Sequence, residues 1–202
     1  MKRSRKDVRR KATAIPRLRF EDQRLTSFAG LVVFQKLFQV LRFKARLASC
    51  FRHQSLGKVF PRPNLFLQLI VHLLLGFREL RHLEYYYDDP LVRRVVGLDT
   101  LPDVATLSRM LKEADQESVG KLRKLLCELV LERLSSHALP RITLDFDGSV
   151  QSTKRKAQGA AVGFNKKKKG ARSYYPLFCT VAQTGQVLSF LHRSGNVHDS
   201  RF

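Results

Sequence analysis

The chain has 202 residues, 44% of them hydrophobic, and a formal net charge of +21 at pH 7. This length and composition can supply the core of one large domain or of two small ones. The longest apolar run, residues 65–77, contains Gln68 and His72 and is too short to cross a bilayer, so a membrane-spanning protein is excluded.

The positive charge is concentrated in the two outer parts of the chain. Residues 1–62 carry 17 Lys and Arg against 3 Asp and Glu, residues 63–140 carry 10 against 11, and residues 141–202 carry 11 against 3. Two basic regions around a neutral middle indicate two surfaces that face a polyanion, and we expect nucleic acid. A solvated basic surface without a specific partner is the alternative.

The three cysteines are scattered, lie in apolar surroundings and form no Cys-x-x-Cys pair. They are typical of buried thiols in a reducing compartment. No secretory signal is visible, because no apolar stretch follows the basic N-terminus. We therefore expect a cytoplasmic protein.

Residues 1–25 form a basic tail that we predict to be disordered. A Thr26-Ser27 cap and an apolar stripe from Leu31 to Leu41 then predict a helix, and a second helix is expected over residues 43–53. Gly57 and residues 61–63, Pro-Arg-Pro, break the chain. Asn64 is the predicted cap of a long helix over residues 65–80.

Local signals also predict the later helices. Asp89 and Pro90 begin a short helix that ends at Gly97, Asp103 caps a helix to about Ala114, and Ser118 caps a helix over residues 119–135. Residues 91–114 have the length of a helix-turn-helix, with Thr106, Ser108, Arg109 and Lys112 near the start of its second helix. Ordinary bundle packing is the alternative that we favour.

After Pro140 the hydrophobic period changes to two, which predicts strands. We expect strands over residues 141–147, 174–182 and 186–192, with a basic connection over residues 151–173 and a turn at Thr184-Gly185. The predicted fold class is therefore α+β, a helical domain followed by an antiparallel meander.

Asp145 and Asp147 lie two residues apart on the first predicted strand, so they share one face. Two neighbouring carboxylates repel each other unless a positive group lies between them, and a divalent metal is the natural candidate. The alternative is a structural role in bracing the turn at Gly148-Ser149. That alternative is as strong as the metal for Asp145, whereas the metal is favoured for Asp147.

Residues 141–199 resemble the DDE-type transposases of bacterial insertion sequences. The motifs follow one another in the family's order: Asp145-Phe-Asp147-Gly-Ser149, Gln158-Gly159-Ala160, Arg172-Ser-Tyr-Tyr-Pro-Leu177 and Gly195-Asn196. The resemblance extends more loosely to residues from Leu25. It implies a ribonuclease-H-like catalytic domain, Mg²⁺ or Mn²⁺ as cofactor, and DNA as partner at transposon ends and at a target.

The resemblance implies that Asp147 is the first acid of the catalytic Asp-Asp-Glu set and that Asp145 is a nearby metal ligand outside the usual triad. The second Asp and the Glu of the family are not found, because Asp199 fits a helix cap better. We expect residues 26–138 to be a helical DNA-binding domain and residues 139–202 a truncated catalytic domain. Such a chain is expected to be inactive alone, unless another polypeptide supplies the missing acids.

The basic residues near this site predict a clamp for DNA phosphates, with solubility as the alternative. They are Lys154, Arg155, Lys156, Lys166, Lys167, Lys168, Lys169 and Arg172. Tyr174 and Tyr175 are expected to pack in the core, and His192 and His198 to be surface residues. The leading hypothesis is that the chain is an N-terminal portion of a transposase. We expect it in the cytoplasm at the bacterial nucleoid, and a homodimer is one oligomeric state that fits. The alternatives are a non-catalytic DNA- or RNA-binding module and a remnant without function.

Overall fold

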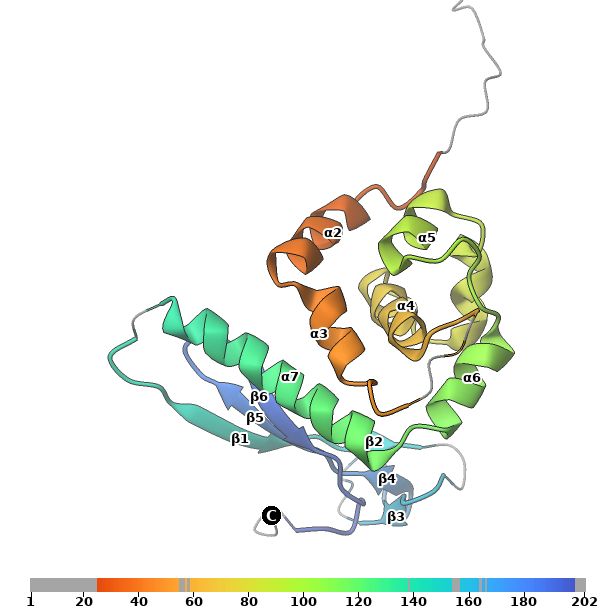
Figure 1. The fold of residues 1–202 in the computed structure, drawn as a ribbon. Helices are drawn as coiled ribbons and strands as arrows, with labels where there is room; N and C mark the ends of the chain where they lie inside the picture. Colours follow the sequence, from red (N-terminus) through yellow and green to blue (C-terminus); the bar gives the residue numbers. More distant parts are fainter. Residues whose placement is uncertain are drawn as a thin grey trace, which may run out of the picture.

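The computed structural model describes residues 25–54, 57, 59–137, 139–153, 157–163, 165 and 167–198. The predicted tail at residues 1–25 therefore lies outside the described part, except for Leu25. A layer of helices is followed by two small antiparallel sheets, so the predicted α+β class is confirmed (Figure 1). The helices are α2 (Leu31–Val40), α3 (Phe43–Ser49), α4 (Arg62–Leu74), the 3₁₀ helix η1 (Leu80–Tyr86), α5 (Pro90–Val96), α6 (Val104–Lys112) and α7 (Gln116–Ser135).

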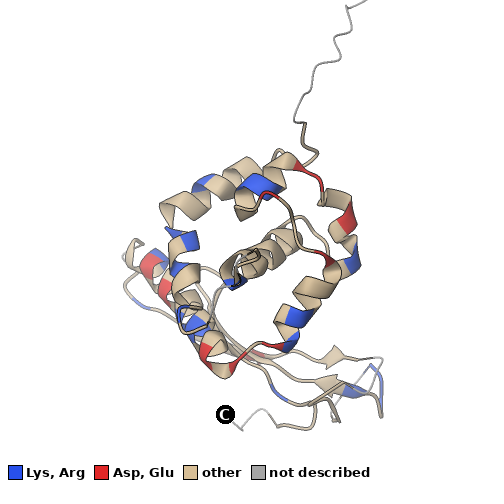
Figure 2. Ribbon diagram, turned by 45° about the vertical axis from the view of Figure 1, so that its right-hand side comes forward, with Lys and Arg blue, Asp and Glu red and all other residues tan. Residues whose placement is uncertain are grey.

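Helix α4 is the centre of the helical layer. It packs against α3, α5 and α6, and Figures 1 and 2 show the other helices arranged around it. Its leucines and Val71 place apolar side chains around most of the helix circumference, and Leu65, Leu67 and Val71 are all buried. A helix that is apolar on most of its circumference belongs in the interior, which explains its central place.

Two of the predicted helix caps are confirmed. The carboxylate of Asp89 accepts hydrogen bonds from the N–H groups of Leu91 and Val92 at the start of α5, and that of Asp103 accepts one from Thr106 in α6. Gly97 ends α5 with φ of 83°, a left-handed conformation that glycine adopts without steric cost.

Three predicted caps are wrong. Helix α7 is capped by Asp115, whose carboxylate accepts from the Ser118 N–H, so Ser118 lies inside the first turn. Helix α4 begins after Pro61, and the side chain of Asn64 instead donates to the carbonyls of Val96 and Gly97. Neither Thr26 nor Ser27 caps α2, which begins after Gly30, and the Thr26 hydroxyl instead donates to the carboxylate of Asp89.

The long predicted helix over residues 65–80 ends early, at Leu74. Gly76 adopts φ of 86°, and the chain then turns into η1. The imidazole of His72 explains how η1 is held: its Nδ1 lies 2.8 Å from the Tyr86 hydroxyl and its Nε2 lies 3.1 Å from the Glu79 carbonyl oxygen. His72 and Tyr86 are both buried, so this polar contact lies within the core.

The predicted helix-turn-helix corresponds to α5 and α6, which are separated by residues 97–103. Helix α5 packs against α2 and α4, whereas α6 packs against α4 and η1. Both helices therefore contribute to the bundle around α4, as either alternative requires.

Helix α7 lies between the helical layer and the larger sheet. Leu125 is buried in the helical core with Leu122 and Leu129 packed beside it, whereas Val130 and Leu134 pack against the sheet residue Val181. Two apolar stripes on different sides of one helix allow it to serve both layers. Arg46 of α3 reinforces the first contact through ion pairs with Glu128 and Glu132 at 3.1 and 2.7 Å.

The larger sheet has the strand order β1-β5-β6 and the smaller has the order β2-β4-β3, all antiparallel. The strands are β1 (Leu144–Gly148), β2 (Gln151–Ser152), β3 (Ala161–Val162), β4 (Arg172–Tyr174), β5 (Leu177–Val181) and β6 (Gln186–Leu191). The predicted turn at Thr184-Gly185 joins β5 to β6, and Gly185 has φ of 66° there.

The predicted strand over residues 174–182 is divided between two sheets, which corrects the sequence-based expectation. Tyr175 and Pro176 separate β4 from β5, because the Tyr175 N–H donates to the Arg193 carbonyl and Pro176 has no N–H to donate. The basic connection is also not wholly irregular, since it contains β2 and β3. The meander of the larger sheet agrees with the prediction for the strands over residues 141–147 and 186–192, apart from their ends.

Candidate functional site

Asp145 and Asp147 lie on β1 and share one face, as predicted. Asp145 is paired with Thr180 and Asp147 with Phe178 of β5, and directly paired residues of antiparallel strands project to the same side. Both aspartates are exposed. Their carboxylates are therefore open to a ligand from solvent.

The other face of β1 is directed toward α7. Leu144 is paired with Val181, which packs against Val130 and Leu134 of α7, and Phe146 is paired with Cys179. Helix α7 covers β6 rather than β1, so Leu144 remains 43% exposed and Phe146 58% exposed. The carboxylates thus point away from α7, on an edge strand of the sheet.

A compact junction follows the carboxylates at the end of β1. The Tyr175 ring lies against the backbone of Gly148, the residue next to Asp147; a Cβ at position 148 would lie only 2.4 Å from Tyr175 Cζ. The Ser149 N–H donates to the Pro176 carbonyl at 3.0 Å. These contacts fix the direction in which the chain leaves β1.

Arg193 holds Tyr175 in this junction. Its Nε donates to the Tyr175 carbonyl at 3.1 Å, and the Tyr175 N–H donates back to the Arg193 carbonyl at 2.9 Å. The guanidinium also lies over the Tyr175 ring, 5.3 Å from its centroid. Arg193 is only 7% exposed, so the sequence-based reasoning missed a buried cation beside the candidate site.

Segments that carry the family resemblance also contact one another next to this junction. The Gly195 N–H donates to the Ser173 carbonyl, and a Cβ on Gly195 would lie 2.5 Å from that carbonyl oxygen and 2.7 Å from that of Ala161. A Cβ on Gly163 would collide with the Gly195 carbonyl. Glycine at these positions permits three backbone segments to touch, a signal that close inspection of the Gly residues could have suggested.

The exposed lysines Lys167, Lys168 and Lys169 lie on one loop. The buried Asn165 shapes that loop: its Oδ1 accepts from the N–H groups of Lys167 and Lys168, and its Nδ2 donates to Ser152 Oγ at 2.9 Å. The ammonium groups are therefore presented by an ordered turn. The predicted DNA-contacting residues Lys154, Arg155, Lys156 and Lys166 lie outside the described part of the chain.

Arg172 has a structural contact in addition to its predicted role at DNA. Its Nε and Nη2 donate to the Ala160 carbonyl at 3.1 and 2.7 Å, across the small sheet. Tyr174 and Tyr175 are half-buried, and the Tyr174 ring lies 4.6 Å from the exposed ring of His192. His192 and His198 are both surface residues, as expected.

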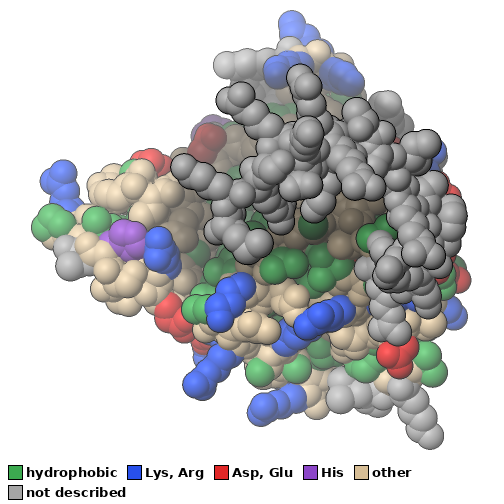
Figure 3. Space-filling view, turned by 90° about the horizontal axis from the view of Figure 1, so that it is seen from above, with side chains coloured by type: hydrophobic (Ala, Val, Ile, Leu, Met, Phe, Trp, Pro, Cys, Tyr) green, Lys and Arg blue, Asp and Glu red, His purple; other side chains and the backbone are tan. Residues whose placement is uncertain are grey.

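The described Lys and Arg residues are spread over several elements instead of gathering on one face. Figure 2 shows Lys and Arg distributed over several helices, with Asp and Glu between them, and Figure 3 shows hydrophobic side chains among Lys and Arg in the view from above. Many of these charges are paired, for example Arg62 with Glu113 at 2.7 Å and Arg93 with Asp88. A polyanion would therefore meet small separate clusters of unpaired Lys and Arg side chains among the described residues.

The residues of β1 fit one part of a magnesium site. Mg²⁺ is commonly held by one or two protein carboxylates, with water and substrate phosphate oxygens completing its octahedron, and Asp145 and Asp147 supply such oxygens. No group of three or more His, Cys, Asp or Glu residues that could hold a metal occurs among the described residues. The described part of the chain thus offers two carboxylates, and a bound metal ion would need further ligands such as water and phosphate oxygens.

The chain belongs to the family described as Transposase DDE domain group 1, which matches residues 10–201. The match covers nearly all of the helical layer and both sheets, so the resemblance extends well beyond the motifs of the strand region. No curated protein and no solved structure matches the chain. Among the described residues, no helix is long and apolar enough to cross a membrane.

Proposed function

We propose that this chain acts in the transposition of an insertion sequence, by binding element-end DNA and contributing Asp147 to metal-dependent strand cleavage and transfer. The observation that carries the proposal is Asp147 itself, an exposed carboxylate at the end of β1 in a chain of the DDE transposase family. The meander β1-β5-β6 supports a ribonuclease-H-like arrangement of this part of the fold. The proposed place of action is the bacterial cytoplasm, at the nucleoid.

Asp147 would hold a divalent ion against a DNA phosphate, with Asp145 as the second carboxylate of the same face. An ion held by these carboxylates would supply Lewis-acid activation of a water or a 3′ hydroxyl and stabilisation of charge on the phosphate oxygens. Tyr175 and Arg193 act as positioning residues, because they fix the backbone that follows Asp147. Lys167, Lys168 and Lys169 would neutralise phosphates of the bound DNA without reading its bases.

The proposal is tested by measuring DNA affinity with and without Mg²⁺ at constant ionic strength. We expect Mg²⁺ to tighten binding by the wild-type chain, and Asp147→Asn to abolish that increment, since an amide lacks the charge that holds the ion. Asp145→Asn should reduce the increment less. The matched control is Asp99→Asn, which removes an exposed carboxylate from the helical layer and should leave the increment intact.

The same preparation should bind DNA without nicking or joining it, because two carboxylates on one strand cannot serve both sides of an in-line displacement. Metal-dependent cleavage that survives Asp147→Asn would contradict the assignment of the site. DNA binding with no Mg²⁺ increment in any variant would favour the non-catalytic binding module instead.

A further inference from the structure

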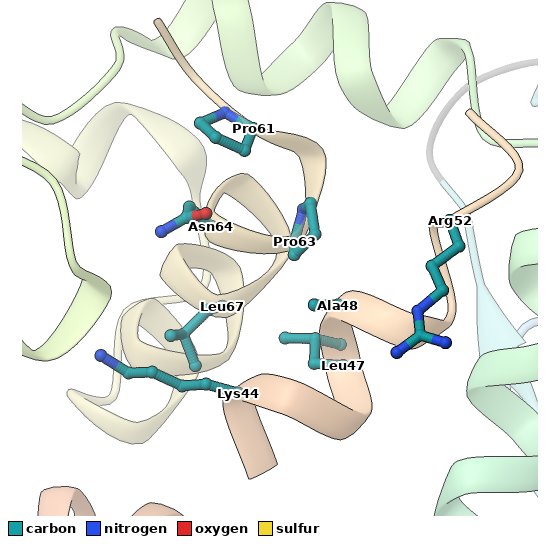
Figure 4. A pocket seen from close by; sticks show the side chains of 8 residues that line it. All are labelled: Lys44, Leu47, Ala48, Arg52, Pro61, Pro63, Asn64 and Leu67. Carbon is teal, nitrogen blue, oxygen red and sulfur yellow. The ribbon is translucent and has the colours of Figure 1, made fainter. Parts of the chain in front are cut away.

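A cavity of about 410 Å³ opens between α3 and the start of α4. Its floor and walls are apolar: Leu47 and Ala48 come from α3, Pro61 and Pro63 from the start of α4, and Leu67 from the next turn (Figure 4). A concave surface of this kind can accept a flat apolar group from solvent.

Two cations lie at opposite ends of this cavity, Lys44 and Arg52, with the apolar side chains between them (Figure 4). No carboxylate lines the cavity, and neither cation forms an ion pair with any described residue. Burial lowers the pKa of the Lys44 ammonium, so its charge is partly desolvated without a compensating anion. An anionic ligand would supply that compensation.

Two other cavities in the described part of the chain differ in this respect. The cavity beside α5 contains Asp88 and Asp99 together with Arg93 and Arg94, and the cavity beside α7 contains Glu128 together with Arg46. Cations of both cavities have carboxylate partners: Arg93 pairs with Asp88, Arg46 with Glu128, and Lys121 with Glu117. The α3–α4 cavity combines an apolar floor with positive charge that is not offset.

The wall of the cavity is preformed. The side chain of Asn64 donates to the carbonyls of Val96 and Gly97 at 3.0 and 3.4 Å, which ties the start of α4 to the end of α5. The rings of Pro61 and Pro63 restrict the backbone and leave no N–H groups that need partners there. A ligand would therefore meet a shaped surface.

We propose that the α3–α4 cavity binds one unpaired nucleotide of DNA, with its base against Ala48 and Pro61, the apolar lining residues that are not buried. Lys44 and Arg52 then contact the phosphates on the two sides of that nucleotide. This inference rests on the proposed function in DNA transposition and specifies the DNA that the helical layer recognises. A paired base keeps its faces within the stack, so intact duplex cannot fill the floor.

The experiment compares a blunt duplex with the same duplex carrying one bulged nucleotide, titrated in low salt. Ala48→Leu fills the cavity from an exposed position of α3, and Ala45→Leu makes the same change on that helix outside the cavity. We expect Ala48→Leu to weaken binding of the bulged duplex by about tenfold, the effect of losing roughly 50 Å² of apolar burial. Affinity for the blunt duplex should stay within about twofold, and Ala45→Leu should change neither.

The cations are tested by Lys44→Ala and Arg52→Ala, which should reduce the preference for the bulged duplex, with Lys36→Ala on α2 as the matched control. A 2-aminopurine at the bulge should change its fluorescence on binding to wild type but not to Ala48→Leu. If the wild-type chain binds the blunt duplex, two results would overturn the inference. One is an equal effect of Ala48→Leu and Ala45→Leu on the bulged duplex, and the other is no preference of the wild type for that duplex. Loss of all DNA binding by the wild-type chain would instead overturn the proposed function.

Discussion

The ring of Tyr175 lies directly on the backbone of Gly148, close enough that any side chain at position 148 would overlap it. Gly148 follows Asp147, so this contact fixes the end of the strand that carries the candidate carboxylates. The contact also explains why the Asp-Gly-Ser and Tyr-Tyr-Pro motifs, nearly thirty residues apart in the printed sequence, form one structural unit.

Gly148→Ala should therefore be destabilising. The new methyl group would force the Tyr175 ring aside, and overpacking of this kind costs about 1–3 kcal/mol in the free energy of unfolding. Urea denaturation measures the change, and Tyr175→Ala in the same chain should relieve part of it. Gly120→Ala is the matched control: Gly120 lies within α7 with nothing within 4 Å of its would-be Cβ, so the change should stabilise by about 0.5–1 kcal/mol. Equal effects at both positions would contradict the tight contact.

The stability of the helical layer should depend on pH through His72. Burial lowers the pKa of His72 below the value of 6.5 that it has when unfolded. Between these two values the unfolded chain binds a proton that the folded chain does not, so stability falls as the pH drops below 6.5. The slope is at most about 1.4 kcal/mol per pH unit.

Denaturation at a series of pH values measures this dependence. The groups that face the imidazole are the Tyr86 hydroxyl, the Glu79 carbonyl and the ring of Phe77. Charge repulsion from His82 also lowers the pKa of His72, by less than burial does. His72→Gln should lower stability at neutral pH and flatten the dependence, whereas the exposed His192→Gln should leave it unchanged. A wild-type chain whose stability is constant through this range would refute the argument.

Two neighbouring aspartates, Asp88 and Asp89, should differ sharply in their effect on stability. Asp89 caps α5 and accepts a hydrogen bond from the Thr26 hydroxyl, so Asp89→Ala should lower the free energy of unfolding by about 1–2 kcal/mol. Asp88 pairs with Arg93 at the surface, where its side chain is 88% exposed, and Asp88→Ala should lose less than about 0.5 kcal/mol. Thermal unfolding of the two variants gives the comparison, and similar losses would show that the cap has no special role.

DNA affinity should fall steeply with salt, because each phosphate neutralised by Lys or Arg releases counterions and adds about −0.9 to the log–log slope. Replacing Lys167, Lys168 and Lys169 by Ala should reduce the magnitude of that slope by one to three such increments. The control replaces Lys36, which lies on α2 far along the chain from this loop. An unchanged slope in the triple variant would assign the loop lysines to solubility.

Much of the helical layer could be predicted because its signals are local. Asp89-Pro90, Gly97 and Asp103 each act on the few residues that follow or precede them, and the structure has those helix ends where expected. The end of α4 was missed although Gly76 is the same kind of local signal as Gly97, because the apolar residues after Gly76 suggested that the helix continues.

The site was predicted only in part. The shared face of Asp145 and Asp147 follows from the period of a strand, which is a local property. The burial of Arg193 and the division of the strand at Tyr175 depend on a contact between residues eighteen positions apart, and no local pattern specifies such a contact.

Helix α7 connects the helical layer to the larger sheet through apolar contacts on both of its sides. Its Leu125 side is embedded in the helical core and its Val130 and Leu134 side supports the sheet, so neither layer can loosen from α7 without exposing apolar surface. A substitution on the sheet side of α7, such as Leu126→Asp, would weaken that coupling and should let the sheet melt before the helical layer.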